Sequence, residues 1–291
     1  KYTAEEPFFS MYDRRQIRAW PHELPDNAPL PLRRMREIRT APEINDSVLR
    51  ELQAVYYGMI TRVDRDLGIV LATIEEEGLT GNSIILFTTD HGDFAGQYGL
   101  PEKWDTCMAD CILHVPCVLA APDVEGGRRV DSLTEHVDVP RTVLDLLDLE
   151  PDWGIHGDSL LTAADGTTRK SAVFADGGHE EEMWGRFSGH LNPDGTPRGV
   201  LDGKQATYLE APETMARTKM VRTEHWKLAI RLVGGNELYD LENDPHELHN
   251  LWPSVETRPD LQDKVKDLQQ EMIEWCLRTD TDRPVQERVG A

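Results

Sequence analysis

The chain has 291 residues, of which 39% are hydrophobic and 29% are charged, and its formal net charge at pH 7 is −22. It is long enough to bury a substantial core, as one large domain or two ordinary ones. The excess of acidic side chains, 53 against 31 basic ones, argues against a nucleic-acid partner and against an anionic membrane surface. No apolar run approaches the roughly 20 residues that a membrane-spanning helix needs.

The chain contains four cysteines, Cys107, Cys111, Cys117 and Cys276, which is too few for a disulfide scaffold. We interpret Cys107 and Cys111 as a reduced pair on a helix face rather than as metal ligands, because the zinc spacing of two intervening residues is absent. The first residues contain no initiator Met and no signal-peptide pattern. We therefore expect the middle of a longer protein, located in the cytoplasm.

The N-terminal part reads as an extended segment followed by a long helix and a strand. Residues 1–45 are rich in Pro and Arg with little periodicity, which predicts an extended surface segment. Apolar residues then recur at helical spacing from a cap at Asp46 or Ser47 to Gly78. Residues 83–89 are apolar and β-branched, which is typical of a central parallel strand covered on both faces. A long helix followed by a strand predicts a right-handed crossover connection of an α/β sheet.

The next elements are shorter. We expect a helical stretch near residues 104–112, a buried strand over residues 115–120, and a helix over residues 139–149. Asp138 would cap that last helix, with Pro140 tolerated in its first turn.

After about residue 168 the pattern changes to that of a small α+β unit. Residues 176–215 are polar and interrupted by Gly and Pro, and they give no clear assignment. An antiparallel meander follows, with short strands predicted over residues 220–223, 226–232 and 237–241. Residues 261–277 form an amphipathic helix pattern that we expect to pack on this meander.

The strand over residues 83–89 stops at Asp90-His91-Gly92-Asp93, the most informative point of the sequence. Ligand sites of open α/β sheets lie beyond the carboxyl ends of the strands, so two metal-competent side chains there form a candidate site. Gly92 allows a sharp turn, which the pair needs because neighbours on a straight strand point to opposite faces. Taken alone, the same residues fit an ordinary turn, and Asp93 is interpreted as one of its turn residues.

Six short motifs, in order along residues 1–255, resemble the landmarks of the sulfatase family. They are Thr89-Asp90-His91-Gly92, then Gly96-x-Tyr98-Gly99-Leu100 with Lys103, His114-Val115-Pro116, Val137-Asp138-Val139-Pro140-Arg141-Thr142, His156-Gly157-Asp158-Ser159-Leu160, and Glu237-Leu238-Tyr239-Asp240-Leu241-x-x-Asp244-Pro245-x-Glu247-x-x-Asn250-Leu251. Tyr98 departs from the pattern, since the family usually has a His there.

The resemblance implies an α/β fold of the alkaline-phosphatase-like superfamily. That fold is a sandwich of a mostly parallel sheet between helices, here only partly present, followed by a small C-terminal subdomain of an antiparallel sheet plus a helix. Residues 1–168 would form the C-terminal part of the catalytic α/β domain, and residues 169–291 the C-terminal α+β subdomain.

The family's nucleophile motif is absent from this sequence. In the family, a Cys or Ser in a Cys/Ser-x-Pro-x-Arg motif is oxidised to formylglycine, and two further metal-binding aspartates lie near the N-terminus. No Cys or Ser of this chain stands in that context. The chain therefore resembles the C-terminal part of a sulfatase-type enzyme, with formylglycine expected upstream.

The resemblance assigns roles to three residues. Asp90 and His91 match the downstream pair of metal ligands, and the metal would be Ca²⁺, with Mn²⁺ second because imidazole suits transition metals. Lys103 matches the lysine that contacts the ester oxygens, where its ammonium would stabilise charge on the transferred group. Other landmark residues are interpreted as turn and cap residues or as members of a solvated loop: His136, Asp138, His156, His179 and Arg186.

The function implied is a sulfuric ester hydrolase, in which a metal assists formylglycine in hydrolysing a sulfate monoester. The alternatives are a phosphonate monoester or phosphodiester hydrolase of the same superfamily, and a non-catalytic sulfatase-like fragment. The expected partners are an anionic sulfate or phosphonate ester and the N-terminal half of the same enzyme, with a homo-oligomer left open. The chain alone is expected to be inactive.

Overall fold

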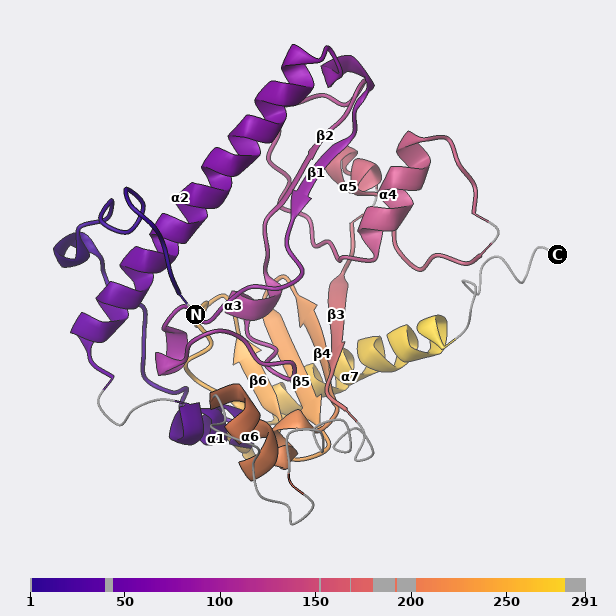
Figure 1. The fold of residues 1–291 in the computed structure, drawn as a ribbon. Helices are drawn as coiled ribbons and strands as arrows, with labels where there is room; N and C mark the ends of the chain where they lie inside the picture. The colour runs from indigo at the N-terminus through magenta and orange to yellow at the C-terminus, as the bar shows by residue number, and fades with distance from the viewer. Residues whose placement is uncertain are drawn as a thin grey trace.

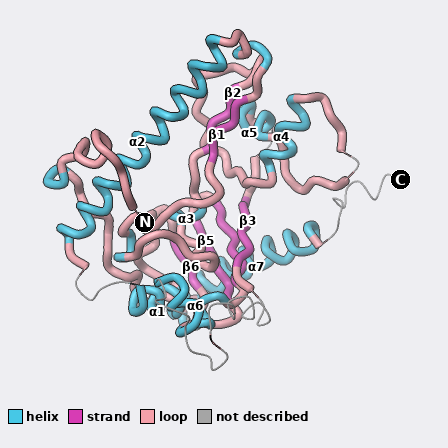
Figure 2. The backbone as a smooth tube through the Cα atoms, in the orientation of Figure 1, coloured by secondary structure: helices cyan, strands magenta, loops and turns pink. Residues whose placement is uncertain are grey.

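The structure is a computed structural model that describes residues 2–39, 44–151, 153–167, 169–179, 192 and 203–280. Its described strands form two antiparallel sheets (Figures 1 and 2). The smaller sheet pairs β1 (Ile85–Thr88) with β2 (Cys117–Ala120). The larger one has the order β3-β4-β5-β6, with strands β3 (Ala172–Gly177), β4 (Thr218–Thr223), β5 (Trp226–Arg231) and β6 (Glu237–Asp240).

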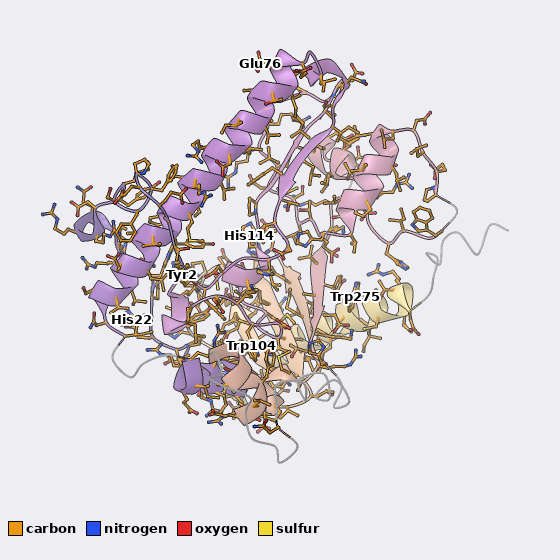
Figure 3. The ribbon with its side chains drawn as sticks, viewed as in Figure 1. Tyr2, His22, Glu76, Trp104, His114 and Trp275 are labelled. Atoms are coloured by element: carbon orange, nitrogen blue, oxygen red, sulfur yellow. The ribbon has the colours of Figure 1, made fainter. Side chains whose placement is uncertain are left out.

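The long helix predicted before the first strand is confirmed as α2 (Asp46–Glu76). Its cap is Asn45 rather than Asp46 or Ser47, since the Asn45 side chain accepts hydrogen bonds from the backbone N–H groups of Ser47 and Val48 at 3.0 and 3.2 Å. Glu76 lies at the end of α2 that is remote from the larger sheet (Figure 3). The carbonyl of Phe8 would lie 2.3 Å from a Cβ at Gly58, so the small residue permits the N-terminal segment to cross α2 closely.

The prediction of a parallel strand covered on both faces is wrong for β1 as the described chain presents it. Ile85 pairs with Ala120 and Thr88 with Cys117, in an antiparallel register. All four residues of β1 are half-buried, and Val118 in β2 is 60% exposed. The burial expected for the two strands is also not found, since β1 is half-buried and three of the four residues of β2 are exposed; the described residues contain neither a parallel neighbour nor layers that cover both faces.

The N-terminal segment is not simply extended, because residues 30–39 form helix α1 (Leu30–Arg39). Pro31 stands in its first turn, where the absent N–H costs nothing. Leu32 and Met35 are 2% and 0% exposed, so one face of α1 is fully buried. The sequence hid this helix because its Pro and Arg residues obscure the short apolar periodicity.

The first hydrophobic core joins α1 to residues 94–112 and to residues 208–215. The Trp104 ring stacks on Tyr208 with centroids 4.8 Å apart, and its indole N–H donates to the Thr214 carbonyl at 3.1 Å. Trp104 lies in the lower part of the molecule, near α1 and α6 (Gly203–Glu210) (Figure 3). The helix expected near residues 104–112 is shorter and lies over α3 (Asp110–Leu113). The side chains of Trp104 and Thr106 instead donate hydrogen bonds to the Thr214 carbonyl.

The second core joins the larger sheet to α7 (Pro259–Thr279) and confirms that the C-terminal helix packs on the meander. Val221, Leu228 and Leu238 are fully buried against the apolar face of α7. That face consists of Leu261, Val265, Leu268 and Met272. Strand β3, which the sequence left unassigned in part, adds a fourth strand beside β4.

Two short helices, α4 (Asp138–Leu146) and α5 (Leu160–Asp165), complete the described elements around β1 and β2 (Figure 1). Asp138 is the first residue of α4 rather than its cap, and its carboxylate accepts hydrogen bonds from the backbone N–H groups of Glu135 and Asp158 at 2.8 and 2.9 Å. Among the described helices, none is both long and apolar enough to cross a membrane. The domain boundary at residue 168 stays a prediction.

Candidate functional site

The loop that follows β1 is held by backbone hydrogen bonds to the segment before β2. Gly92 N–H donates to the Ile112 carbonyl at 2.7 Å, and Asp93 N–H donates to the Cys111 carbonyl at 3.0 Å. A Cβ on Gly92 would lie 2.1 Å from the Cys111 carbonyl oxygen. Glycine is therefore required here by the close approach of another backbone segment, a reason that the sequence alone did not reveal.

Asp90 and His91 place two ligand atoms next to each other at this loop. His91 Nδ1 lies 2.8 Å from the Gly92 carbonyl oxygen. Because a carbonyl only accepts, Nδ1 carries the proton, and in the neutral imidazole Nε2 presents its lone pair. Nε2 lies 3.4 Å from Asp90 Oδ2, and the two side chains are 37% and 81% exposed.

This spacing fits two ligands of one cation. Oxygen and nitrogen ligands bind divalent metals at about 2.0 to 2.6 Å, so two ligands at right angles lie about 2.8 to 3.7 Å apart. Metal-ligating histidines typically donate their other ring N–H to a carbonyl or carboxylate, as His91 does to Gly92. Among the described residues no group of three or more His, Cys, Asp and Glu side chains could hold a metal, so this pair forms part of a coordination shell at most.

The electrostatics of the loop keep Asp90 ionised. The charge of His91 lowers the pKa of the Asp90 carboxyl while the ring is protonated, a form that cannot bind a metal through Nε2. Hydrogen bonds from His91 N–H at 3.0 Å and from the Thr89 hydroxyl at 3.2 Å also favour the carboxylate. A deprotonated carboxylate is the form that a metal needs.

Asp93 turns the chain away from the pair. Its Oδ1 accepts hydrogen bonds from Ala95 N–H at 2.7 Å and from the Tyr2 hydroxyl at 2.6 Å. Burial raises the pKa of the Asp93 carboxyl. With this oxygen already bonded inside the loop, Asp93 acts as the turn residue that the sequence predicted.

Lys103 returns to the same loop. The Phe94 N–H donates to the Glu102 carbonyl at 2.7 Å, and the Glu102 N–H donates to the Tyr2 hydroxyl at 2.6 Å. Arg39 holds the Lys103 carbonyl at 3.2 Å. Lys103 is half-buried, and its ammonium forms no hydrogen bond or ion pair with any described residue. Its backbone is therefore fixed, while its ammonium acts on the Asp93 carboxyl through its charge and without a direct contact.

The structure also brings His136 to the loop. His136 Nε2 lies 2.8 Å from the carbonyl oxygen of Thr89, the residue just before Asp90. The sequence offered a turn role for His136 but gave no signal of this contact, because 47 residues separate the partners. Tyr98, in contrast, is 1% exposed and belongs to the first core. His179 lies 3.7 Å from Asp105, whereas Arg186 is outside the described residues.

The model of the sulfatase family matches residues 2–149, which is half of the chain and includes Asp90, His91 and Lys103. The chain belongs to the sulfatase family. Arylsulfatase K of Xenopus laevis is 24% identical over 228 residues, covering 77% of this sulfatase chain and 38% of that relative. This sulfatase chain thus spans about two fifths of the length of that curated relative.

Solved structures show the same fold. The phosphonate monoester hydrolase of Silicibacter pomeroyi matches with a TM-score of 0.71 and 20% identity, over 97% of this sulfatase chain and 54% of that chain. The phosphonate monoester hydrolase of Agrobacterium radiobacter matches with a TM-score of 0.68 and 22% identity, over 93% of this chain and 54% of that one. The α/β fold expected from the resemblance is confirmed.

In this sulfatase chain, the segment after the Asp90 loop is anchored on the larger sheet by buried charges. Lys227, which is 1% exposed, donates to the Met108 carbonyl at 3.0 Å and pairs with Asp110 and Glu247. Glu247 in turn accepts from Asp110 N–H at 2.7 Å. Although burial opposes it, Lys227 lowers the pKa of Asp110. The family landmark that contains Glu247 therefore helps to hold the segment around Asp110 on the larger sheet.

Proposed function

We propose that this sulfatase chain is the C-terminal portion of a sulfuric ester hydrolase that cleaves a sulfate monoester with metal assistance. Its nucleophile would be a formylglycine located upstream of this chain. One observation carries the proposal: His91 Nε2 and Asp90 Oδ2 converge at 3.4 Å while Nδ1 is committed to the Gly92 carbonyl. That arrangement lies inside the span that matches the family.

The metal proposed for this pair is Ca²⁺, with Mn²⁺ as the alternative. A divalent cation bound there would supply positive charge to an anionic ester and lower the pKa of a hydroxyl beside it. Asp90 contributes an ionised oxygen ligand, and His91 contributes Nε2 in a tautomer fixed by Gly92. Calcium prefers oxygen ligands, whereas imidazole suits transition metals, and His91 is therefore the reason to retain Mn²⁺ as the alternative.

Lys103 is proposed to contact the ester oxygens. The net charge of −22 repels an anionic substrate at long range, so binding must rely on local positive charge. The Lys103 ammonium has no hydrogen-bond or ion-pair partner among the described residues. Its backbone is held by the hydrogen bond from Arg39 to the Lys103 carbonyl and by the bond from Phe94 N–H to the Glu102 carbonyl beside it. The ammonium can therefore donate to oxygens on which negative charge grows during the reaction.

The second candidate is hydrolysis of a phosphonate monoester, favoured by the fold likeness to two phosphonate monoester hydrolases. The test uses this chain together with its upstream half, and compares turnover of 4-nitrophenyl sulfate, 4-nitrophenyl phenylphosphonate and 4-nitrophenyl phosphate. The proposal predicts the highest kcat/KM for the sulfate, abolished by chelation and restored by Ca²⁺ or Mn²⁺. A higher value for the phosphonate would select the second candidate, and no turnover of any ester would favour a non-catalytic role.

A further inference from the structure

Tyr2 lies between α2 and the loop that carries the candidate site. Its ring meets the Tyr56 ring of α2 edge-on, with ring centroids 5.9 Å apart, and Figure 3 shows Tyr2 beside this helix. Edge-on pairs of aromatic rings are favourable and fix the direction in which a ring points. The ring of Tyr2 therefore rests on a long helix, while its hydroxyl reaches Asp93 in the loop.

The Tyr2 hydroxyl joins the two arms of this loop. It donates to Asp93 Oδ1 at 2.6 Å and accepts from the Glu102 backbone N–H at 2.6 Å. Asp93 stands two residues after His91, and Glu102 directly precedes Lys103. These two hydrogen bonds, the Tyr2 bridge, thus connect the arm that carries the candidate metal ligands to the arm that carries the lysine.

The surroundings keep the Tyr2 hydroxyl protonated. Burial raises the pKa of this hydroxyl, and the hydrogen bond to Asp93 raises it further. Burial also raises the pKa of the Asp93 carboxyl, whereas the hydrogen bond from Tyr2 and the charge of Lys103 act in the opposite direction. The ammonium of Lys103 is therefore close enough to the Tyr2 bridge to act on Asp93 through its charge.

Other hydrogen bonds hold the loop together independently of Tyr2. The Phe94 N–H donates to the Glu102 carbonyl at 2.7 Å. Arg39 of α1 donates to the Glu102 carboxylate at 2.8 Å and to the Lys103 carbonyl at 3.2 Å. Loss of the Tyr2 hydroxyl alone should therefore leave the loop folded, but free the two arms to shift relative to each other.

We propose that Tyr2 is a positioning residue for Lys103, and that the Tyr2 bridge sets where Lys103 stands relative to Asp90 and His91. In this role Tyr2 acts through Lys103 and does not touch the ester. The inference rests on the proposed hydrolase function, because it concerns the alignment of the lysine with an ester beside the metal ligands. A misplacement of about 1 Å can cost on the order of 10²-fold in rate.

Amide hydrogen exchange of the 291-residue chain, followed by nuclear magnetic resonance, tests the Tyr2 bridge without turnover. Tyr2→Phe keeps the ring on Tyr56 and removes only the hydroxyl. The Glu102 N–H should exchange about tenfold faster in this variant, because it loses its acceptor. Unchanged exchange at Glu102 would overturn the proposal.

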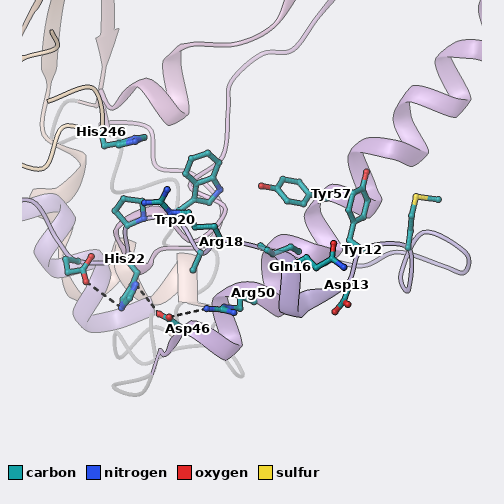
Figure 4. A pocket seen from close by; sticks show the side chains of 15 residues that line it. Tyr12, Asp13, Gln16, Arg18, Trp20, His22, Asp46, Arg50, Tyr57 and His246 are labelled. Atoms are coloured by element: carbon teal, nitrogen blue, oxygen red, sulfur yellow. Dashed lines mark ion pairs between the residues drawn. The ribbon is translucent and has the colours of Figure 1, made fainter. Parts of the chain in front are cut away.

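Tyr12→Phe is the matched control. The Tyr12 hydroxyl lies 2.6 Å from Thr61 Oγ1, so this variant also loses a hydroxyl contact between the N-terminal segment and α2. Tyr12 lines a separate cavity of about 1050 Å³, whose lining residues include neither Tyr2 nor Lys103 (Figure 4). Exchange at Glu102 and kcat should match those of the parent. Changes as large as those of Tyr2→Phe would overturn the proposal, because the effect would not be specific to the Tyr2 bridge.

With the upstream half supplied, a double-mutant cycle tests whether Tyr2 acts through Lys103. The substrate is whichever of the three 4-nitrophenyl esters the parent enzyme hydrolyses fastest. Tyr2→Phe should lower kcat about tenfold with metal content unchanged. In the Lys103→Ala background the same substitution should change kcat by less than about twofold. A merely structural role would multiply the two losses instead.

Multiplied losses would overturn the proposal, and so would a near-parental kcat for Tyr2→Phe. Loss of metal in Tyr2→Phe would overturn it as well, because Tyr2 would then act on the metal ligands. If the parent enzyme hydrolyses none of the three esters, the proposed function is refuted and the role of Tyr2 in the reaction with it. The two failures are distinguishable, since exchange at Glu102 is measured without turnover.

Discussion

Gly92→Ala should damage both the stability of the chain and the geometry of the Asp90–His91 pair. The added Cβ would lie 2.1 Å from the Cys111 carbonyl oxygen and 3.2 Å from the Cα of Ile112, both backbone atoms, whereas ordinary contact begins at 3.4 Å. The two segments must therefore separate by more than an ångström. That movement breaks the hydrogen bonds from Gly92 N–H at 2.7 Å and Asp93 N–H at 3.0 Å. At about 0.5 to 1.5 kcal/mol for each bond, unfolding should become easier by about 1 to 3 kcal/mol.

Urea denaturation followed by circular dichroism measures this change in the free energy of unfolding. The matched control is Gly81→Ala, because a Cβ at Gly81 meets nothing within 4 Å, and it should lie within about 0.5 kcal/mol of the parent chain. Equal stability of the Gly92→Ala variant and the parent chain would refute the close-approach argument. Destabilisation of the same size in both variants would refute it too.

Four further predictions concern chemistry and charge. The 291-residue chain alone should show no turnover, because it supplies at most two metal ligands and no nucleophile motif; metal-dependent hydrolysis of an aryl sulfate by the mass-verified chain would contradict this. With the upstream half supplied, Lys103→Ala should lower kcat by about 10² to 10³ with metal content unchanged, and near-normal turnover or loss of metal would disprove the assignment. Lys227→Met should cost about 3 to 5 kcal/mol of stability, because Glu247 stays buried without its cation, although Asp110 keeps its ion pair with Arg222 at 3.3 Å; Lys266→Met, at a side chain that is 70% exposed, should cost little. Because the pKa of Asp110 in the folded chain lies below its ordinary value of 3.8, its contribution to stability should be present above pH 3.8 and lost as the pH falls through the folded value. Asp110→Asn should therefore reduce the loss of stability on acidification. An unchanged dependence of the free energy of unfolding on pH would contradict this role of Asp110.

Local patterns predicted the elements whose burial is periodic. The apolar spacing of α2 and α7 and the alternation in β4 to β6 were sufficient to predict these elements. One face of α7 is buried along much of its length, whereas the buried residues of α2 lie only in its first half, from Leu49 to Gly58. Helix α1 was missed since only Leu32 and Met35 carry its deeply buried apolar face among prolines and arginines. The antiparallel pairing of β1 with β2 could not be predicted, because the apolar composition of a strand gives no information on whether its neighbour runs parallel or antiparallel.

The candidate site likewise contains residues that the sequence predicted and contacts that it did not. Asp90 and His91 were predicted because they follow a strand directly and match a family motif. The contact of His136 with the Thr89 carbonyl, the need for Gly92 and the support from Lys227 all depend on partners far away in the sequence. Such contacts are set by the packing of whole elements and leave no local signal, except that Glu247 stands within a family landmark.

The central claim is that Asp90 and His91 bind one divalent cation, and a titration of the chain with Mn²⁺ tests it most directly. Nuclear magnetic resonance of the histidine side chains detects Mn²⁺ by paramagnetic broadening, and His91→Gln assigns the signal. We expect the His91 signal to broaden at lower Mn²⁺ concentration than that of His249, whose side chain is 65% exposed, and excess Ca²⁺ to reverse the broadening. Asp90→Asn should remove this preference, while Asp131→Asn, at a side chain that is 78% exposed, should keep it. If His91 broadens no earlier than His249, or if Asp90→Asn leaves the titration unchanged, the pair is not a metal site.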